Sequence, residues 1–182
     1  MRARLKLGAQ VVAAAGVGVL ATLLIWNLTH QTPPPKVGAP PPAFSLRRLS
    51  GAGSISLRSL RGKTVVLNFF ASWCAPCKRE APVLEHFWLQ NRERKLVVLG
   101  VDTGPDVASD GRRFVEAHGI TYPVLFDPNA DVASNRYEVP GLPVTYVLNP
   151  QGRVVGGAIV GPVSDHPYAQ TFLRDLHAAL AS

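Results

Sequence analysis

The stretch that decides the fold reads Thr64-Val-Val-Leu-Asn-Phe-Phe-Ala-Ser-Trp-Cys-Ala-Pro-Cys77. Its first seven residues are mostly β-branched and aromatic, which predicts a buried strand over 64–70. Apolar residues then recur at helical spacing from Ala81 to Trp88, which predicts a helix from Ala75 to about Asn91. The two cysteines of the chain therefore stand where a strand ends and a helix begins.

This junction favours chemistry at Cys74. The first N–H groups of a helix have no internal partner and the helix dipole is positive there, so a thiolate is stabilised. The thiolate is the reactive form of cysteine. Cys77 lies one turn further along the same side of the helix, where it can attack a mixed disulfide formed on Cys74 and release the partner.

Two other uses of the cysteine pair fit less well. A structural crosslink closing so short a loop would constrain the unfolded chain by only about 2 kcal/mol. A zinc site needs four ligands, and no two of the five histidines stand three to five residues apart. We therefore predict a redox-active C-x-x-C pair and no metal site.

The segment Asn68-Phe-Phe-Ala-Ser-Trp-Cys-Ala-Pro-Cys-Lys-Arg-Glu-Ala-Pro82 resembles the active-site segment of the thioredoxin superfamily. It is most similar to membrane-anchored, extracytoplasmic thiol–disulfide oxidoreductases of the TlpA/ResA/DsbE type, which serve cytochrome c maturation. The resemblance runs from about Ala43 to the C-terminus. It implies that Cys74 is the nucleophile, that Cys77 resolves the mixed disulfide, and that Trp73 and Pro76 belong to the partner-binding surface. For Trp73, simple core filling is the alternative.

The rest of the chain alternates strand and helix patterns. We expect a hairpin over 44–57, strands over 95–101 and 122–126, a helix over 107–118 that stops at Gly119, a short helix through Arg136, a hairpin over 144–160 and a closing helix over 167–180. This order predicts an α/β fold, a thioredoxin-like mixed sheet flanked by helices, with an N-terminal β-hairpin extension.

A second motif reads Val139-Pro-Gly-Leu-Pro-Val-Thr-Tyr146. Thioredoxin-like proteins place a cis-proline beside the cysteines before the penultimate strand, and the resemblance assigns that place to Pro143. Proline cannot donate in a sheet, so it marks the start of a strand. A cis bond would turn the Leu142 amide and carbonyl outward to pair with an extended substrate. The alternative is an ordinary trans proline on an edge strand.

Resolution by Cys77 requires a base, because its thiol must lose a proton. Cytoplasmic thioredoxins carry a buried aspartate six residues before the first cysteine, and this chain has Asn68 there. An amide is no general base. Glu80, one turn beyond Cys77, is our candidate, since burial would raise its pKa. The alternative is a solvated charge beside Lys78 and Arg79.

The N-terminal stretch differs from the rest. Arg2, Arg4 and Lys6 precede an apolar segment over 7–28, which would span roughly 33 Å as a helix, enough for a bilayer core of about 30 Å. Its basic flank predicts a cytoplasmic start and an extracytoplasmic domain at the cell membrane. A cleaved signal peptide is the alternative, although no small-x-small site follows the segment. We expect an anchor over 1–30, a stiff Pro-rich linker over 31–42 and the thioredoxin-like domain over 43–182.

The net charge of +7 does not indicate nucleic-acid binding. Four basic residues lie in the N-terminal stretch and linker, which leaves 15 basic and 12 acidic residues in the domain. No basic stripe is interleaved with aromatic residues. The expected partners are protein disulfides, with apocytochrome c implied by the resemblance, and an integral-membrane thiol reductase as electron donor. We expect no organic cofactor.

Two rival functions share this fold. Copper metallochaperones usually space their cysteines C-x-x-x-C and add a histidine, whereas this chain has C-x-x-C and no methionine after Met1. Peroxiredoxins carry P-x-x-x-T-x-x-C, whereas Ala71-Ser-Trp73 precedes Cys74. The sequence thus favours thiol–disulfide exchange, with a copper-site role as the alternative.

Overall fold

The computed structural model describes residues 15–26 and 33–182. Residues 15–26 are helical, with exposed apolar side chains. Among all described residues, no helix is both long and apolar enough to cross a membrane. The remainder of the segment predicted over 7–28 lies outside the described residues.

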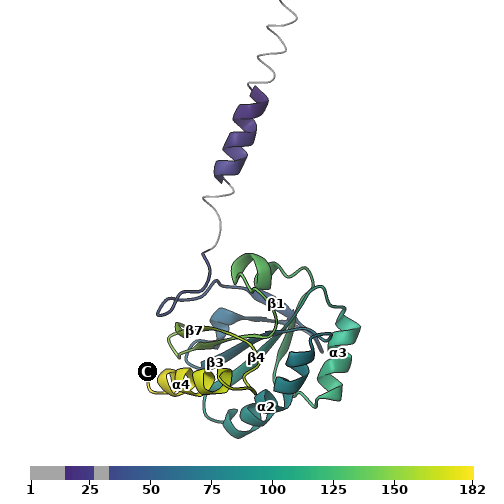
Figure 1. The fold of residues 1–182 in the computed structure, drawn as a ribbon, viewed down its shortest axis with the longest axis vertical. Helices are drawn as coiled ribbons and strands as arrows, with labels where there is room; N and C mark the ends of the chain where they lie inside the picture. The colour runs from purple at the N-terminus through teal and green to yellow at the C-terminus, as the bar shows by residue number, and fades with distance from the viewer. Residues whose placement is uncertain (1–14, 27–32) are drawn as a thin grey trace, which may run out of the picture. The chain divides into compact units, whose positions relative to one another are not determined.

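Residues Pro33–Ser182 form a compact unit around one seven-stranded mixed sheet (Figure 1). The strand order is β2-β1-β5-β4-β3-β6-β7. The strands are β1 (Ser45–Arg48), β2 (Ser54–Ser56), β3 (Thr64–Phe70), β4 (Leu96–Thr103), β5 (Val124–Asp127), β6 (Val144–Leu148) and β7 (Val154–Val160). The helices are α2 (Ala75–Asn91), α3 (Ala108–Ala117) and α4 (Tyr168–Leu180), with short turns η1 (Leu57–Leu60) and η2 (Asp131–Arg136). The structure thus confirms the predicted mixed sheet, its flanking helices and its N-terminal hairpin.

Strands β3 and β4 form the centre of the sheet, and every residue of both is buried. They run parallel, with Thr64 opposite Leu96 and Phe70 opposite Asp102. Burial on both faces explains why these strands are nearly continuous apolar runs. The register brings the carboxyl ends of β3 and β4 to one edge of the sheet, where the cysteines follow.

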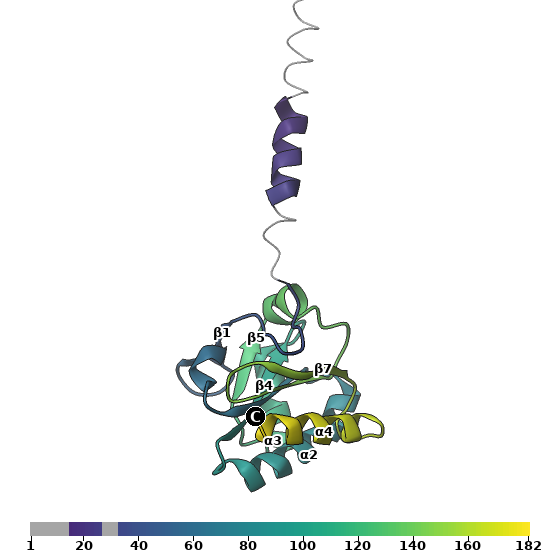
Figure 2. The same ribbon diagram turned by 90° about the vertical axis from the view of Figure 1, so that its left-hand side faces the viewer.

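The two faces of the sheet are covered differently. Figure 2 shows α2, α3 and α4 gathered on one face, where Leu84, Phe114 and Leu176 join one apolar cluster. On the other face, η1, η2 and the segment before β1 pack against a second cluster that contains Leu57 and Tyr137. Two β–α–β crossovers in the same direction place α2 and α3 on one side of the sheet.

Part of the expected linker contacts the sheet. Val37 forms a parallel bridge with Val154, and the Gly38 amide donates to the Val154 carbonyl at 2.8 Å. Arg153 donates to the Gly38 carbonyl at 2.8 Å, and the Tyr137 hydroxyl donates to the Pro42 carbonyl at 2.9 Å. The chain therefore enters the compact unit beside the start of β7.

Candidate active site at the strand-to-helix junction

Cys74 and Cys77 form a disulfide bond at the start of α2, with Cα atoms 5.3 Å apart. Cys74 is the N-cap residue, and its sulfur accepts a hydrogen bond from the Cys77 amide at 3.2 Å. Only 4% of Cys74 and 1% of Cys77 is exposed. Cys74 thus lies at the helix N-terminus, as the sequence predicted, and the Cys77 N–H points at its sulfur, where it would stabilise negative charge.

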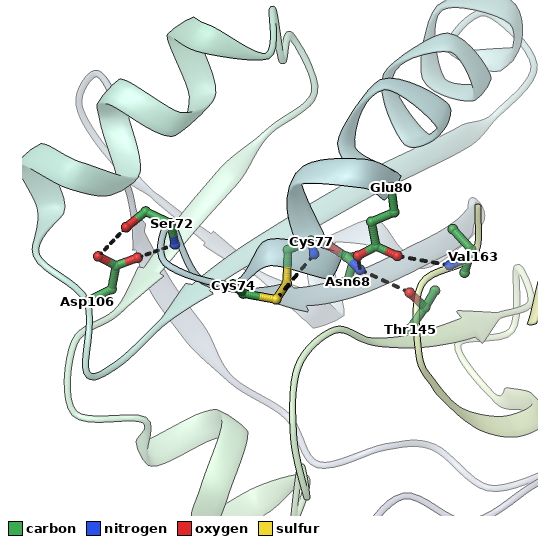
Figure 3. The surroundings of a disulfide bond; sticks show 8 residues. All are labelled: Asn68, Ser72, Cys74, Cys77, Glu80, Asp106, Thr145 and Val163. Atoms are coloured by element: carbon green, nitrogen blue, oxygen red, sulfur yellow. Dashed lines mark hydrogen bonds between the residues drawn. A yellow bond between two sulfur atoms is a disulfide. The ribbon is translucent and has the colours of Figure 1, made fainter. Parts of the chain in front are cut away.

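Glu80 lies inside the protein and is not a solvated charge, because only 1% of it is exposed. Its Oε1 accepts from the Asn68 amide at 2.8 Å, and its Oε2 accepts from the Val163 backbone N–H at 3.1 Å (Figure 3). Asn68 also donates to the Thr145 hydroxyl at 3.0 Å. Burial raises the pKa of Glu80 from 4.5 to about 7, and the negative charge of Asp165 contributes to this rise.

A second acidic residue holds the turn that leads into Cys74. Asp106 accepts hydrogen bonds from the backbone N–H and the hydroxyl of Ser72, as Figure 3 shows. The Trp73 indole N–H donates to the Pro105 carbonyl at 3.0 Å, and 56% of Trp73 is exposed. Trp73 therefore lies on the surface beside the cysteines, which removes core filling as its role.

Asp102, at the end of β4, is completely buried. Neither of its carboxylate oxygens has a hydrogen-bond partner of good geometry among the described residues. Burial, followed by the proximity of Asp106 and the charges of Asp106 and Asp110, raises the pKa of Asp102 to about 8. The helix α3 approaches so closely that a Cβ at Gly111 would overlap the Asp102 carboxylate. Burial therefore disfavours the charged form of this carboxyl.

Pro143 follows a cis peptide bond, as the motif predicted. It directly precedes Val144, which pairs with Phe69 at the end of β3 that leads to Cys74. Leu142 is partly buried and packs against the apolar cluster that contains both cysteines. Its backbone N–H and C=O have no hydrogen-bond partner within residues 15–26 and 33–182. They are open to pairing with another chain.

The fold brings most of the predicted residues to one edge of the sheet. Trp73, Pro76 and the cysteines lie at the start of α2, Glu80 lies one turn later, and Leu142 and Pro143 lie at the start of β6.

Sequence reasoning missed the aspartates at positions 102 and 106. A carboxylate at the end of a fully buried strand was the available signal. In the part of the chain that the structure describes, no group of three or more potential ligands could hold a metal ion.

Comparisons with known proteins agree with this geometry. Residues 37–156 match the model of the AhpC/TSA family. The thiol-disulfide oxidoreductase ResA of Oceanobacillus iheyensis is 29% identical over 142 residues, covering 76% of this chain and 72% of that protein. Thioredoxin-like protein YneN of Bacillus subtilis is 36% identical over 148 residues, covering 74% of this chain and 83% of that protein.

A solved structure shares both fold and sequence. A thiol:disulfide interchange protein of the thioredoxin family from Chlorobium tepidum superposes with a TM-score of 0.64 at 32% identity. The match covers 78% of this chain and 96% of that one.

Proposed function

This chain belongs to the AhpC/TSA family and is a thiol–disulfide oxidoreductase with a Cys74–Cys77 disulfide, and we propose that it reduces disulfides of extracytoplasmic proteins from a membrane anchor. The observation that carries the proposal is the buried Glu80 carboxyl, one turn from Cys77 on the helix that begins at Cys74. It supplies a base with a pKa near neutrality where the second cysteine must lose a proton.

The proposed cycle begins with the reduced dithiol. The Cys74 thiolate attacks a partner disulfide, so one partner sulfur is released as a thiolate and the other is bonded to Cys74. Glu80 accepts the proton of the Cys77 thiol, and the resulting thiolate attacks the Cys74 sulfur. The bond between Cys74 and the partner breaks, and the second partner sulfur leaves as a thiolate that takes up the proton from Glu80. The first released thiolate takes up a proton from water, so the partner leaves as a dithiol that has gained two electrons, and the Cys74–Cys77 disulfide remains. A second thiol exchange restores the reduced pair, and neither organic cofactor nor metal takes part.

Partner binding is proposed to use the open backbone before β6. The unpaired N–H and C=O of Leu142 can pair with an extended substrate strand. Pro143 holds this backbone at the cysteine end of β3, and its carbonyl accepts from the Gly161 amide at 3.0 Å. Trp73 and Pro76 supply apolar surface on the other side of the substrate.

The proposed location follows from the apolar segment and its basic flank over 2–6. In this arrangement, residues 1–30 anchor the chain, 31–42 form the linker and 43–182 work outside the cytoplasm. The resemblance of the active-site segment to oxidoreductases of cytochrome c maturation supports apocytochrome c as a substrate. It also supports an integral-membrane thiol reductase as the electron donor.

A trapping experiment tests this function. In the Cys77→Ala variant, the mixed disulfide on Cys74 cannot be resolved, so the natural partner should stay attached and be named by mass spectrometry. We expect apocytochromes among the partners of Cys77→Ala and none with the matched Cys74→Ala variant. Reproducible trapping only of proteins without a haem-attachment C-x-x-C-H segment would contradict the cytochrome role. No Cys74-dependent adduct would contradict the reductase role.

A further inference from the structure

The end of the sheet opposite the cysteines carries a cluster of basic side chains. Six exposed residues form this basic end: Lys36, Arg61, Lys63, Arg94, Lys95 and Arg153. None of the six forms a salt bridge with another described residue. The only acidic residue in the segments that carry them, 33–40, 61–63, 92–95 and 149–153, is Glu93, which pairs with Arg92.

The sheet register places these residues together. Lys63 and Lys95 directly precede the parallel strands β3 and β4, and the Thr64 amide donates to the Lys95 carbonyl at 2.9 Å. The Gly62 amide donates to the Pro150 carbonyl at 2.8 Å, which brings the hairpin before Arg153 to the same end. The cysteines follow the other end of β3, roughly 20 Å away along a seven-residue strand.

The same end receives the chain from its N-terminal segment. Val37 bridges to Val154, and Arg153 donates to the Gly38 carbonyl. The residues that join the predicted anchor to the compact unit therefore arrive among the six basic side chains. By contrast, Asp106, Glu138 and Asp165 lie on loops at the cysteine end.

We propose that this basic end docks on a membrane surface of anionic lipid headgroups and holds the dithiol facing away from the bilayer. The inference rests on the proposed anchor, which keeps the domain close to the membrane. Each basic side chain near an anionic surface shifts the bound population by roughly fivefold. Several such contacts orient the domain without any lipid-specific pocket, and salt weakens them because the charges are exposed.

Lysine labelling of the full chain tests the proposal. The chain is reconstituted in nanodiscs of phosphatidylcholine alone or with added phosphatidylglycerol. An acetylating reagent then modifies exposed lysines, and lysines in contact with lipid headgroups react more slowly. Lys63 and Lys95 report on the basic end, whereas the exposed Lys78 reports on the cysteine end. In anionic discs, we expect acetylation of Lys63 and Lys95 to slow about fivefold or more and that of Lys78 to stay unchanged.

Two charge-matched variants locate the effect. Arg61→Gln with Arg94→Gln removes two charges from the basic end, whereas Arg112→Gln with Arg113→Gln removes two from α3. Protection of Lys63 and Lys95 should fall only with the first pair. An equal loss with both pairs would show that net charge and not this face matters, and would overturn the proposal.

The remaining outcomes separate docking from anchoring. If the chain enters discs of both compositions but Lys63 and Lys95 are acetylated at equal rates in both, the docking proposal alone is overturned. The basic end would then be a binding surface for an acidic protein. A chain that does not co-purify with either kind of disc contradicts the anchor and the docking proposal together. The rate of thiol exchange with a soluble peptide disulfide is not expected to change with either pair of substitutions.

Discussion

The Asn68 side-chain amide donates a 2.8 Å hydrogen bond to the carboxylate of Glu80, and both groups are almost completely buried. The bond joins the central strand β3 to helix α2, which contains Cys77 and has Cys74 as its N-cap. Asn68 therefore holds the buried acid in place although it cannot itself act as a base.

Glu80→Gln is expected to change the pH dependence of thiol exchange and leave the fold intact. The pKa of Glu80 is about 7, so its basic form accumulates as the pH rises through neutrality. Wild-type resolution should accelerate over this range, and Glu80→Gln should lack this rise and be slower by about tenfold or more at about pH 8. Rapid-mixing measurements of mixed-disulfide resolution would show this. Glu116→Gln, at an exposed position of α3, is the control. A profile unchanged by Glu80→Gln would remove Glu80 from the mechanism.

The stability of the oxidised protein should fall as the pH rises from about 4 to about 8. Folding raises the pKa of Asp102 from 3.8 to about 8 and that of Glu80 from 4.5 to about 7. The folded state therefore binds more protons than the unfolded state between about pH 4 and pH 8. The stabilisation from the two protonated carboxyls is complete below this range and is lost as the pH rises through their folded pKa values. The loss is up to about 1.4 kcal/mol per pH unit for each group.

Asp102→Asn isolates the larger of these contributions. The variant should show a flatter curve of unfolding free energy against pH, measured by urea denaturation, with only the part due to Glu80 remaining. A curve with the wild-type slope up to pH 8 would mean that Asp102 is ionised in the folded protein.

Gly111→Ala should destabilise the domain by about 1–3 kcal/mol, because the new methyl group would overlap the buried carboxylate of Asp102. Asp102→Ala removes the atoms that clash, so the double variant should regain part of the loss. Gly141→Ala is the control, since no heavy atom of a described residue beyond its chain neighbours lies within 4 Å of an added Cβ. Thermal unfolding compares the four variants with the wild type. Equal costs at positions 111 and 141 would show that α3 can move away from β4.

Trp73→Ala should weaken substrate binding with little effect on stability, within about 1 kcal/mol, because its side chain is mostly exposed. Trp88 is partly buried against both apolar clusters. Trp88→Ala should instead cost about 3 kcal/mol of stability. Steady-state exchange with a peptide disulfide should give a higher KM for Trp73→Ala. A large loss of stability without any change in KM would assign Trp73 to packing.

Much of the fold was predictable because the central strands are mostly apolar and the connections carry strong signals. Strand β3 and helix α2 have the predicted bounds, since a β-branched run ends at a proline-containing helix start. Predicted bounds moved by one or two residues where a loop residue continues a strand, as at the end of β4. Segment η2 is a π-helical turn, whereas the sequence predicted a short helix without indicating its type.

The surroundings of the cysteines were less predictable, because they depend on contacts between distant segments. Helical periodicity alone left Glu80 open to two interpretations, and its burial depends on Asn68 and on Val163, 83 residues later. Asp102 stands at the end of an apolar run, and the sequence around Asp106 resembles an ordinary polar loop. Only the pairing of β4 with β3 brings these acids to the turn before Cys74.

The bridge between Val37 and Val154 has a consequence for how two copies of this chain meet. Strand β7 is the longer of the two outermost strands, and an uncovered outermost strand is a template for aggregation. The segment before the domain occupies the first hydrogen-bonding positions of β7, and Gly156 and Gly157 interrupt its regular geometry further on. The connection to the N-terminal segment thus also shields the sheet from recruiting another copy.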